Sequence, residues 1–375
     1  MTSHPTQPPR GNILTPSGWM LGTIAFDGPR IAALDAAPCL RPEENGLPLI
    51  LPGFIDLHIH GGNGSDYADG EDGIRAFMRY HAQQGTVALT PTTSTAPIPV
   101  IETALADIAR VQSGPAKDEP VVLGAHLEGP FINPGKLGAQ SDCTLLPDLD
   151  LAARWMKICG LRIATVAPEM PGGMELTSAL AAMGCRVQVG HSLASPELLA
   201  RAFGSGMVGF THLFNGMSGA HHRDAGVGAF ALAHGDYAEL ISDMIHVDRT
   251  MMLAAIRAIP RLFAITDATA AAGLPDGRYA SSDDQAVIKT GLTVMTEDGR
   301  SLAGSAITML DAYRNLVSLG LSPARASELC STRQADYLGL EDLGRLTPGR
   351  SASLVVLNQR DLSIQEVWMR GVKIR

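Results

Sequence analysis

Seven histidine and acidic side chains follow short apolar stretches in the central part of the chain. Imidazole and carboxylate groups are the ligands that zinc and iron bind in proteins, and both can also transfer protons. Because the ends of neighbouring strands meet in space, such residues can form one site although they lie far apart in the sequence. They are His58, His60, Glu128, His191, His212, His246 and Asp267.

The spacing of His58 and His60 suits a shared metal ion. Residues two apart on a strand point to the same face, so both imidazoles can reach one ion. An HxH pair alone is weak evidence, because strand-end histidines are often structural. Glu128, His191 and His212 at three further strand ends reinforce it, so we predict a catalytic metal site with an open position for water. The competing interpretation is a set of satisfied core polar groups.

Asp267 follows the apolar sequence RLFAIT and precedes small residues. We expect its carboxylate at the same site, as a metal ligand or a general base. Asp is also a favoured helix N-cap, and capping is the alternative. The strand-end position favours catalysis. His126, two residues before Glu128, is expected to be a buried supporting residue rather than a ligand.

The elements that position these residues recur about every 20 to 35 positions. Each unit has a β-branched apolar run, then polar or Gly residues, then a segment with helical spacing of apolar residues. Eight such units predict an α/β fold, a (β/α)8 TIM barrel, with active-site residues at the carboxyl ends of its strands. A doubly wound sheet is the alternative, but GGNGSD is too weak a match to a dinucleotide fingerprint. The runs span 51–61, 85–93, 121–130, 161–169, 185–192, 207–215, 238–247 and 261–269.

Both ends of the chain differ from this pattern. Residues 1–50 and 344–375 contain short strand-like pieces broken by Gly and Pro, and we predict that they form one small β-sandwich domain. Residues 51–343 are then the catalytic barrel. Residues 284–300 are expected to form a strand pair with an Asp-Gly turn after the eighth barrel strand.

Composition excludes several classes of protein. With 375 residues, 45% of them hydrophobic, the chain can bury a large core, and its net charge of -9 argues against sequence-independent nucleic-acid binding. Five cysteines without a CxxC pair suggest neither a disulfide framework nor a cysteine zinc site. The first residues lack the apolar core of a signal peptide, and no long apolar run occurs. We therefore expect a cytoplasmic protein without a membrane or nucleic-acid partner.

A series of motifs in chain order resembles a known family. The motifs are PGFIDLHIHG, HLEGPFINPGKLGAQ, VGHS, THLFNGMS, HHRDAG, DMIHVD, ITDATAAAGLPDG, LAGSAITM and GRLTPGRSASLVVL. Together they are similar to the N-acetylglucosamine-6-phosphate deacetylases of the amidohydrolase superfamily, over almost the whole chain. HLEGPF, LFNGMS and TDA fall where the strand pattern places the ends of the third, sixth and eighth strands.

The resemblance implies a divalent metal, with zinc expected and iron or another ion as the alternative. Glu128, His191 and His212 would bind it, and His58 and His60 could hold a second ion, so one or two ions per chain are expected. Asp267 would be the proton shuttle. The resemblance also implies a homodimer, in which an arginine from the neighbouring subunit can enter the site. The implied substrate-binding residues are Ala139, Gln140, Asn215, Gly216, Arg223, His246, Leu302, Ala303 and Gly304.

Two departures from the family pattern concern the substrate. The family usually reads KGAH after EGP, with the histidine near the substrate's acetamide and hydroxyls, whereas this chain reads LGAQ and has Gln140 there. The loop after LFNGMS is one residue shorter than usual, with Gly219-Ala220 before the two histidines, and this changes the spacing to Arg223.

The activity that the resemblance implies is hydrolysis of the acetamide of N-acetylglucosamine-6-phosphate, a phosphorylated amino sugar. Deacetylation of N-acetylgalactosamine-6-phosphate, or hydrolysis of another N-acyl substrate, is the nearest alternative. Cyclic-amide enzymes often use a modified lysine on the fourth strand, and LRIATVAPE has none. A binding protein that has lost catalysis is the alternative from another class. It would be expected to lose such residues, but this chain keeps all six, the five expected metal ligands and Asp267.

Overall fold

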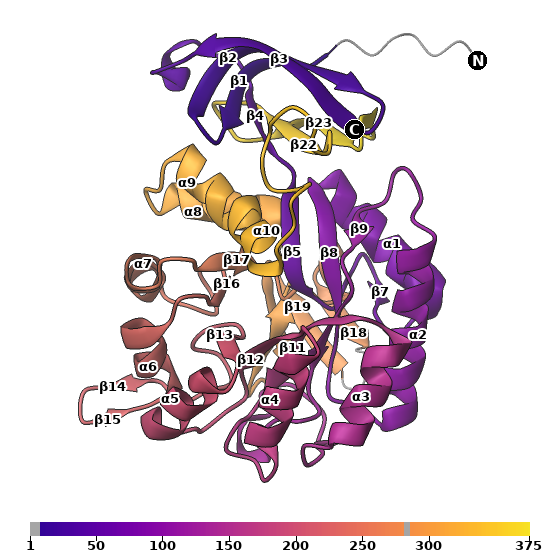
Figure 1. The fold of residues 1–375 in the computed structure, drawn as a ribbon, viewed down its shortest axis with the longest axis vertical. Helices are drawn as coiled ribbons and strands as arrows, with labels where there is room; N and C mark the ends of the chain where they lie inside the picture. Colours follow the sequence, from indigo (N-terminus) through magenta and orange to yellow (C-terminus); the bar gives the residue numbers. More distant parts are fainter. Residues whose placement is uncertain (1–7, 281–285) are drawn as a thin grey trace.

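Eight strands curl into a parallel barrel in the computed structural model, which describes residues 8–280 and 286–375 (Figure 1). Six pair in the order β13-β12-β11-β10-β8-β5, and β16 pairs with β17. The amide of Leu213, just after β13, donates to the Glu239 carbonyl at 2.9 Å, and the Asp267 amide donates to the His58 carbonyl at 2.9 Å, which closes the ring. Each of the eight predicted runs contains one of these strands, so the predicted fold class is confirmed. They are β5 (Phe54–Ile59), β8 (Thr86–Thr93), β10 (Ala125–Glu128), β11 (Leu161–Val166), β12 (Arg186–Val189), β13 (Met207–Phe210), β16 (Glu239–Ile241) and β17 (Phe263–Ile265).

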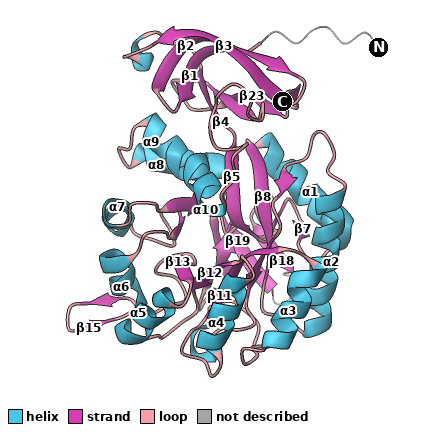
Figure 2. Ribbon diagram, viewed as in Figure 1, coloured by secondary structure: helices cyan, strands magenta, loops and turns pink. Residues whose placement is uncertain are grey.

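Helices follow the barrel strands and surround them (Figure 2). Their first turns carry N-terminal signals that the sequence contains: the Ser195 side chain accepts from the Leu198 amide at the start of α5, and Thr308 and Asp311 form a capping box on α8. The surrounding helices are α1 (Gly70–Gln83), α2 (Ile98–Ser113), α3 (Leu149–Ile158), α4 (Gly173–Ala182), α5 (Pro196–Gly204), α6 (Val227–His234), α7 (Arg249–Ala258) and α8 (Met309–Ser318). Then come α9 (Pro323–Ser327), a π-helical turn (Glu328–Thr332) and α10 (Arg333–Leu338).

The end of the barrel formed by the amino ends of its strands is filled. Ile55, Leu57, Ile163 and Phe263 pack there against Tyr337 of α10, and all of them are fully buried. The amino ends of the strands are thus packed, which leaves the carboxyl ends as the expected place for a ligand site.

Strands from both chain ends form one seven-stranded sheet, in the order β24-β23-β22-β4-β1-β2-β3. It lies beside the barrel at the top of Figure 1. β4 runs to Pro52, past the boundary predicted at residue 50, because it pairs with β22 from the C-terminal end. Residues 1–7 of the predicted domain lie outside the described residues, and the division into two domains remains a prediction. The strands are β1 (Arg10–Thr15), β2 (Gly18–Asp27), β3 (Arg30–Pro38), β4 (Leu49–Pro52), β22 (Leu354–Leu357), β23 (Ile364–Met369) and β24 (Val372–Lys373), with a 3-10 turn at Pro42–Glu44.

A four-stranded sheet is inserted after the eighth barrel strand, where the sequence predicts a strand pair. It contains β18 (Gly277–Ala280), β19 (Ala286–Thr290), β20 (Thr293–Thr296) and β21 (Leu302–Ser305). The predicted Asp-Gly turn, Asp298-Gly299, lies between β20 and β21, whereas the turn between β19 and β20 contains Gly291. Of the predicted segment, residues 284 and 285 lie outside the described residues.

Smaller elements lie in the loops of the barrel. They are β6 (Gly61–Gly62), β7 (Ser65–Asp66), β9 (Val121–Val122), η2 (Pro134–Lys136), β14 (Ala220–His221) and β15 (Asp224–Ala225). No helix in the described part of the chain is long and apolar enough to cross a membrane. All five cysteines are free.

Candidate active site

The main cavity opens at the carboxyl ends of the barrel strands and has a volume of about 480 Å³. This volume is typical of a site for a small molecule. Its inner end is lined by His60, Glu128, His191, His212 and Asp267. The seven histidine and acidic residues that the sequence places at strand ends thus meet at this mouth, with His58 directly beneath the lining.

Glu128, His191 and His212 form one compact group of donor atoms. Glu128 Oε1 lies 3.1 Å from His191 Nε2 and 2.7 Å from His212 Nε2, and the two nitrogens are 3.1 Å apart. All three residues are buried, at the ends of β10, β12 and β13.

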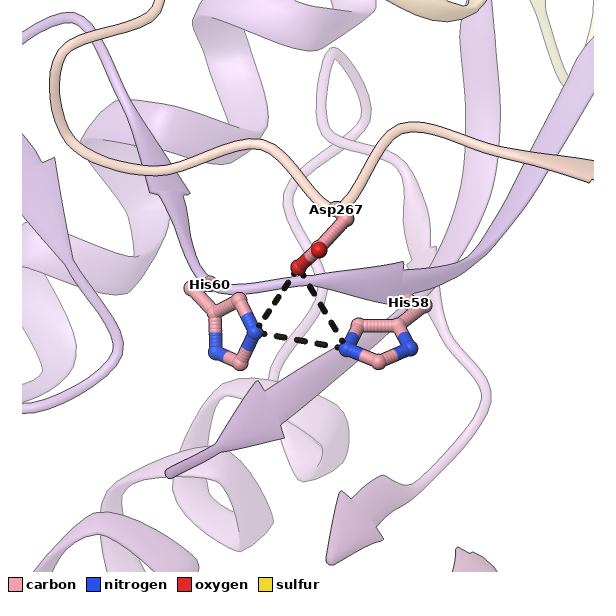
Figure 3. A group of neighbouring side chains, drawn as sticks. All are labelled: His58, His60 and Asp267. Atoms are coloured by element: carbon pink, nitrogen blue, oxygen red, sulfur yellow. Dashed lines mark hydrogen bonds and ion pairs between the residues drawn. The ribbon is translucent and has the colours of Figure 1, made fainter. Parts of the chain in front are cut away.

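His58, His60 and Asp267 form a second group (Figure 3). His60 Nε2 lies 3.3 Å from His58 Nε2 and 3.1 Å from Asp267 Oδ1, and the distance from His58 Nε2 to Asp267 Oδ1 is 3.5 Å. His58 lies in β5, His60 directly follows it, and Asp267 follows β17. Residues 268–276 form turns and a bridge rather than a helix, so the helix-capping interpretation of Asp267 is wrong.

Glu128 connects the two groups. Its Oε1 faces His191 and His212, whereas its Oε2 lies 3.5 Å from His58 Nε2 and 3.4 Å from His60 Nε2. Two ligands about 2.0–2.1 Å from a tetrahedral ion are about 3.3 Å apart. The distances within the two groups run from 2.7 to 3.5 Å, so the donors are near enough to one another for one divalent cation per group, with Glu128 between them.

In three of these histidines, the ring nitrogen that faces away from the donor group, Nδ1, lies within hydrogen-bond distance of another part of the protein. His191 Nδ1 donates to the Lys136 carbonyl at 2.7 Å, and His60 Nδ1 lies 3.1 Å from the Thr92 carbonyl. His58 Nδ1 lies 2.9 Å from Glu239 Oε2. Such contacts fix the tautomer and turn Nε2 toward the cavity.

Glu239 is the residue of this site that the sequence analysis missed. It lies in β16 and is fully buried. The available signal was a charged residue inside the otherwise apolar run AELI. His126, in contrast, has the predicted supporting position, since it is buried with Nδ1 near the Leu57 carbonyl and Nε2 2.9 Å from Thr165 Oγ1.

Opposite charges dominate the electrostatics. Burial raises the pKa of Glu128, but His58 and hydrogen bonds from His191 and His212 outweigh burial and hold that pKa well below its usual value. For His60, burial lowers the pKa, yet Asp267 and Glu128 raise it to about 9. The Glu128 carboxylate therefore stays ionised, and the carboxylates stabilise positive charge on the groups beside them, which is the environment that a bound cation requires.

Backbone strain marks the same strand ends. His191, His212 and Asp267 have φ values of 47°, 30° and 52°, in the left-handed region that residues with side chains rarely adopt. Gly216 leaves room for one of these rings, because a Cβ there would lie 2.9 Å from His191 Nδ1. Strained residues gather at functional sites because the surrounding structure holds them in place.

The predicted substrate-binding residues occupy the rest of the cavity, with one exception. Gln140 accepts from the Thr95 amide at 2.9 Å, and its Nε2 lies 3.3 Å from His191 Nε2. His246 Nδ1 bonds Asp243 at 2.6 Å, and this bond raises the pKa of His246 against the effect of burial. Further lining residues are Ala139, Asn215, Gly216, Leu302, Ala303 and Gly304.

Arg223 is the exception. It lies on the exposed turn between β14 and β15, where its guanidinium contacts His222 Nε2 at 3.0 Å. It is not among the described residues that line the cavity of its own chain. Its predicted contact with a substrate phosphate therefore requires an arrangement that a single chain does not provide.

The amidohydrolase family pattern matches residues 49–374, which include the barrel and the metal-ligand groups. The chain therefore belongs to the amidohydrolase family. It is 36% identical to the N-acetylgalactosamine-6-phosphate deacetylase of Escherichia coli O157:H7, over 96% of each chain. It is also 36% identical to the N-acetylglucosamine-6-phosphate deacetylase of Vibrio furnissii, over 93% of this chain and 88% of that protein.

A solved structure agrees with these relatives. The N-acetyl-D-glucosamine-6-phosphate deacetylase of Mycobacterium smegmatis, in complex with N-acetyl-D-glucosamine-6-phosphate, superposes with a TM-score of 0.88 at 27% identity. The match covers 96% of this chain and 97% of that one. The family resemblance expected from the motifs is confirmed.

Proposed function

We propose that this protein hydrolyses the acetamide of N-acetylglucosamine-6-phosphate to glucosamine-6-phosphate and acetate. The observation that carries the proposal is the pair of donor groups that share Glu128 at the barrel mouth. It is supported by the 36% identity to the deacetylase of Vibrio furnissii.

The reaction depends on a divalent metal. Zinc is the first candidate and iron or another divalent ion the second, with one or two ions per chain. Glu128, His191 and His212 would hold one ion, and His58 and His60 would hold the other. A cation bound there would lower the pKa of a nearby water toward neutrality and would polarise the amide carbonyl.

Asp267 is the proton shuttle of the proposed mechanism. Its carboxylate accepts a proton from the attacking water as the water oxygen bonds to the amide carbon. The carbon–nitrogen bond then breaks, and the Asp267 carboxyl returns the proton to the leaving nitrogen, so that acetate and a free amine result. Gln140 donates a hydrogen bond to the carbonyl oxygen while that oxygen carries negative charge.

The far end of the substrate carries the phosphate, which His246 and Arg223 would bind. His246 lines the cavity, but Arg223 lies outside the cavity of its own chain. We therefore propose a homodimer in which the exposed Arg223 hairpin reaches the cavity of the partner. The free cysteines support a reducing compartment, and we place the enzyme in the cytoplasm.

N-acetylgalactosamine-6-phosphate is the second candidate substrate. Two observations favour it: the 36% identity to the Escherichia coli enzyme, and Gln140 where the family usually has histidine. The residue at this position lies beside the candidate metal ligand His191 and is therefore placed to contact the substrate near the reacting amide.

Acetate release from four substrates tests the proposal: the gluco and galacto N-acetyl amino sugars, each with and without a 6-phosphate. We expect the phosphorylated gluco sugar to react fastest, the reaction to stop after chelation, and zinc to restore it. Faster release from the phosphorylated galacto sugar would establish the second candidate. No release from any of the four by the zinc-loaded protein would contradict both.

A further inference from the structure

Glu239 lies between the two donor groups and contacts both. Its Oε2 is 2.9 Å from Nδ1 of the His58 ring, and the same oxygen accepts from the His212 backbone amide at 3.1 Å. The Glu239 carbonyl also accepts from the Leu213 amide at 2.9 Å. A fully buried carboxylate is costly unless its contacts offset the cost, so its position calls for an explanation.

We propose that Glu239 is a positioning residue that makes His58 a metal ligand and thereby decides whether the His58–His60 group binds its own ion. The inference rests on the metal dependence in the proposed function. A neutral imidazole carries one proton, and the acceptor beside one nitrogen decides which nitrogen keeps a free electron pair. With Glu239 accepting from Nδ1–H, the free pair is on Nε2, which faces His60 and Asp267.

The Nδ1 partner of His58 differs in kind from those of His191 and His60. His191 and His60 place Nδ1 against main-chain carbonyls, of Lys136 and Thr92, which mutation of a side chain cannot remove. His58 places Nδ1 against a carboxylate, which makes an imidazole a stronger electron donor toward a metal. One substitution at position 239 can therefore remove the partner of one ligand.

The two contacts of Glu239 predict unequal effects on the two groups. Toward His58 it touches the ligating ring itself, whereas toward His212 it touches only a backbone amide. The bond between the Leu213 amide and the Glu239 carbonyl is independent of the side chain and keeps that strand end in place. Loss of the carboxylate should weaken the ion at His58 and His60 and leave the ion at His191 and His212 nearly unchanged.

The test compares zinc binding by the full-length wild type, Glu239→Gln and Glu239→Leu, each stripped of metal and titrated in zinc buffers. We expect two zinc equivalents in the wild type. Gln keeps an oxygen that can accept from both N–H groups but removes the charge, so we expect the second equivalent to bind about tenfold more weakly. Leu removes the acceptor, so we expect a loss of about a hundredfold or more in the second equivalent only.

Thr90→Val is the matched control. Its hydroxyl donates to the Leu57 carbonyl at 2.7 Å, next to His58 in the sequence, and is equally buried, but it does not touch the imidazole. This variant should keep both equivalents at wild-type affinity. Melting of the metal-free proteins identifies a folding failure, and if Glu239→Leu does not fold, Glu239→Gln decides.

Three results would overturn the inference: wild-type affinities in both Glu239 variants, equal weakening of both equivalents, or a single equivalent in the wild type. Acetate release measured on the same wild-type samples keeps the proposed function separate. Deacetylation with one equivalent would disprove the role of Glu239 and leave the proposed function standing.

Discussion

The inner and outer ends of the main cavity are built in different ways. At the inner end, every donor side chain is buried on a strand or within two residues of a strand end, and most are oriented by a second contact. At the outer end, the cationic side chains lie on turns: Arg300 is exposed in the inserted sheet, and Arg223 lies on a hairpin outside the cavity. The donor groups of the reacting end all come from one chain, whereas Arg223, the predicted phosphate ligand, lies outside the cavity of its own chain.

This difference follows from how each end is held. Strand ends of a closed barrel cannot shift without breaking the ladder, so they suit a site that must keep donor atoms within tenths of an ångström. Turns tolerate substitution and movement, so they suit recognition of variable groups. Substitutions at the inner end should therefore abolish turnover, and those at the outer end should change substrate preference.

The largest effect is expected from Glu128→Gln, because both donor groups lose their shared carboxylate. An amide is a poorer ligand for a hard dication, so metal content should fall and turnover should fall about 10⁴-fold. Metal analysis and acetate release on the same preparation check both effects. Full metal content and full activity would show that Glu128 is not a metal ligand. The contrast between the inner and outer ends of the cavity would then lose its basis.

Asp267→Asn should come next. The amide keeps the shape of the side chain but cannot accept a proton, so kcat should fall about 10²- to 10⁴-fold while substrate still binds. Separate measurement of kcat and KM distinguishes this result from lost binding. A kcat within a few-fold of the wild type would mean that another group moves the proton.

Arg223→Met tests the outer end. A hydrogen bond to a charged group contributes about 1.5–3 kcal/mol, so kcat/KM for the phosphorylated sugar should fall about tenfold to a hundredfold. The unphosphorylated sugar should react as before. Arg278→Met is the control, since Arg278 is exposed in the inserted sheet and paired with Glu297 rather than placed in the cavity.

Equal losses of kcat/KM for both sugars in Arg223→Met would assign the arginine to folding or assembly. Sedimentation of the variant separates these two, since a broken dimer would lower its mass.

The smallest effect is expected at Gln140, which lies where the two ends meet. Gln140→Ala removes a neutral hydrogen bond of about 0.5–1.5 kcal/mol and should lower kcat/KM about two- to twelvefold. Gln140→His introduces a group that titrates near pH 6 to 7, so the pH profile of kcat/KM should gain a limb there, and the gluco–galacto preference should shift. Unchanged kinetics of both variants on both epimers would show that this side chain does not touch the sugar.

Local patterns in the sequence were enough to predict the barrel and its candidate ligands. The β-branched runs recur at the spacing expected of a barrel, and the HxH pair has the two-residue period of a strand. Each run, like the HxH pair, is a pattern of only a few neighbouring residues, so it can be recognised without knowledge of the fold. The position of the Asp-Gly turn and the extent of β4 were harder to predict. β4 continues to Pro52 because it pairs with Leu354 in β22, about 300 residues away.

The sequence by itself determined which chemical groups stand at the strand ends, because residue type and strand period are local properties. Only the tertiary structure decided how those groups combine. Closure of the barrel brings Asp267 to His60 and lets Glu128 face two groups of histidines, and it turns Glu239 from a charge in an apolar run into the partner of His58. Arg223 shows the converse. Its motif predicts a contact with the substrate phosphate, but the hairpin that carries Arg223 lies outside the cavity of its own chain. Distances between residues far apart in the chain depend on the closure of the whole barrel, and no short segment contains that information.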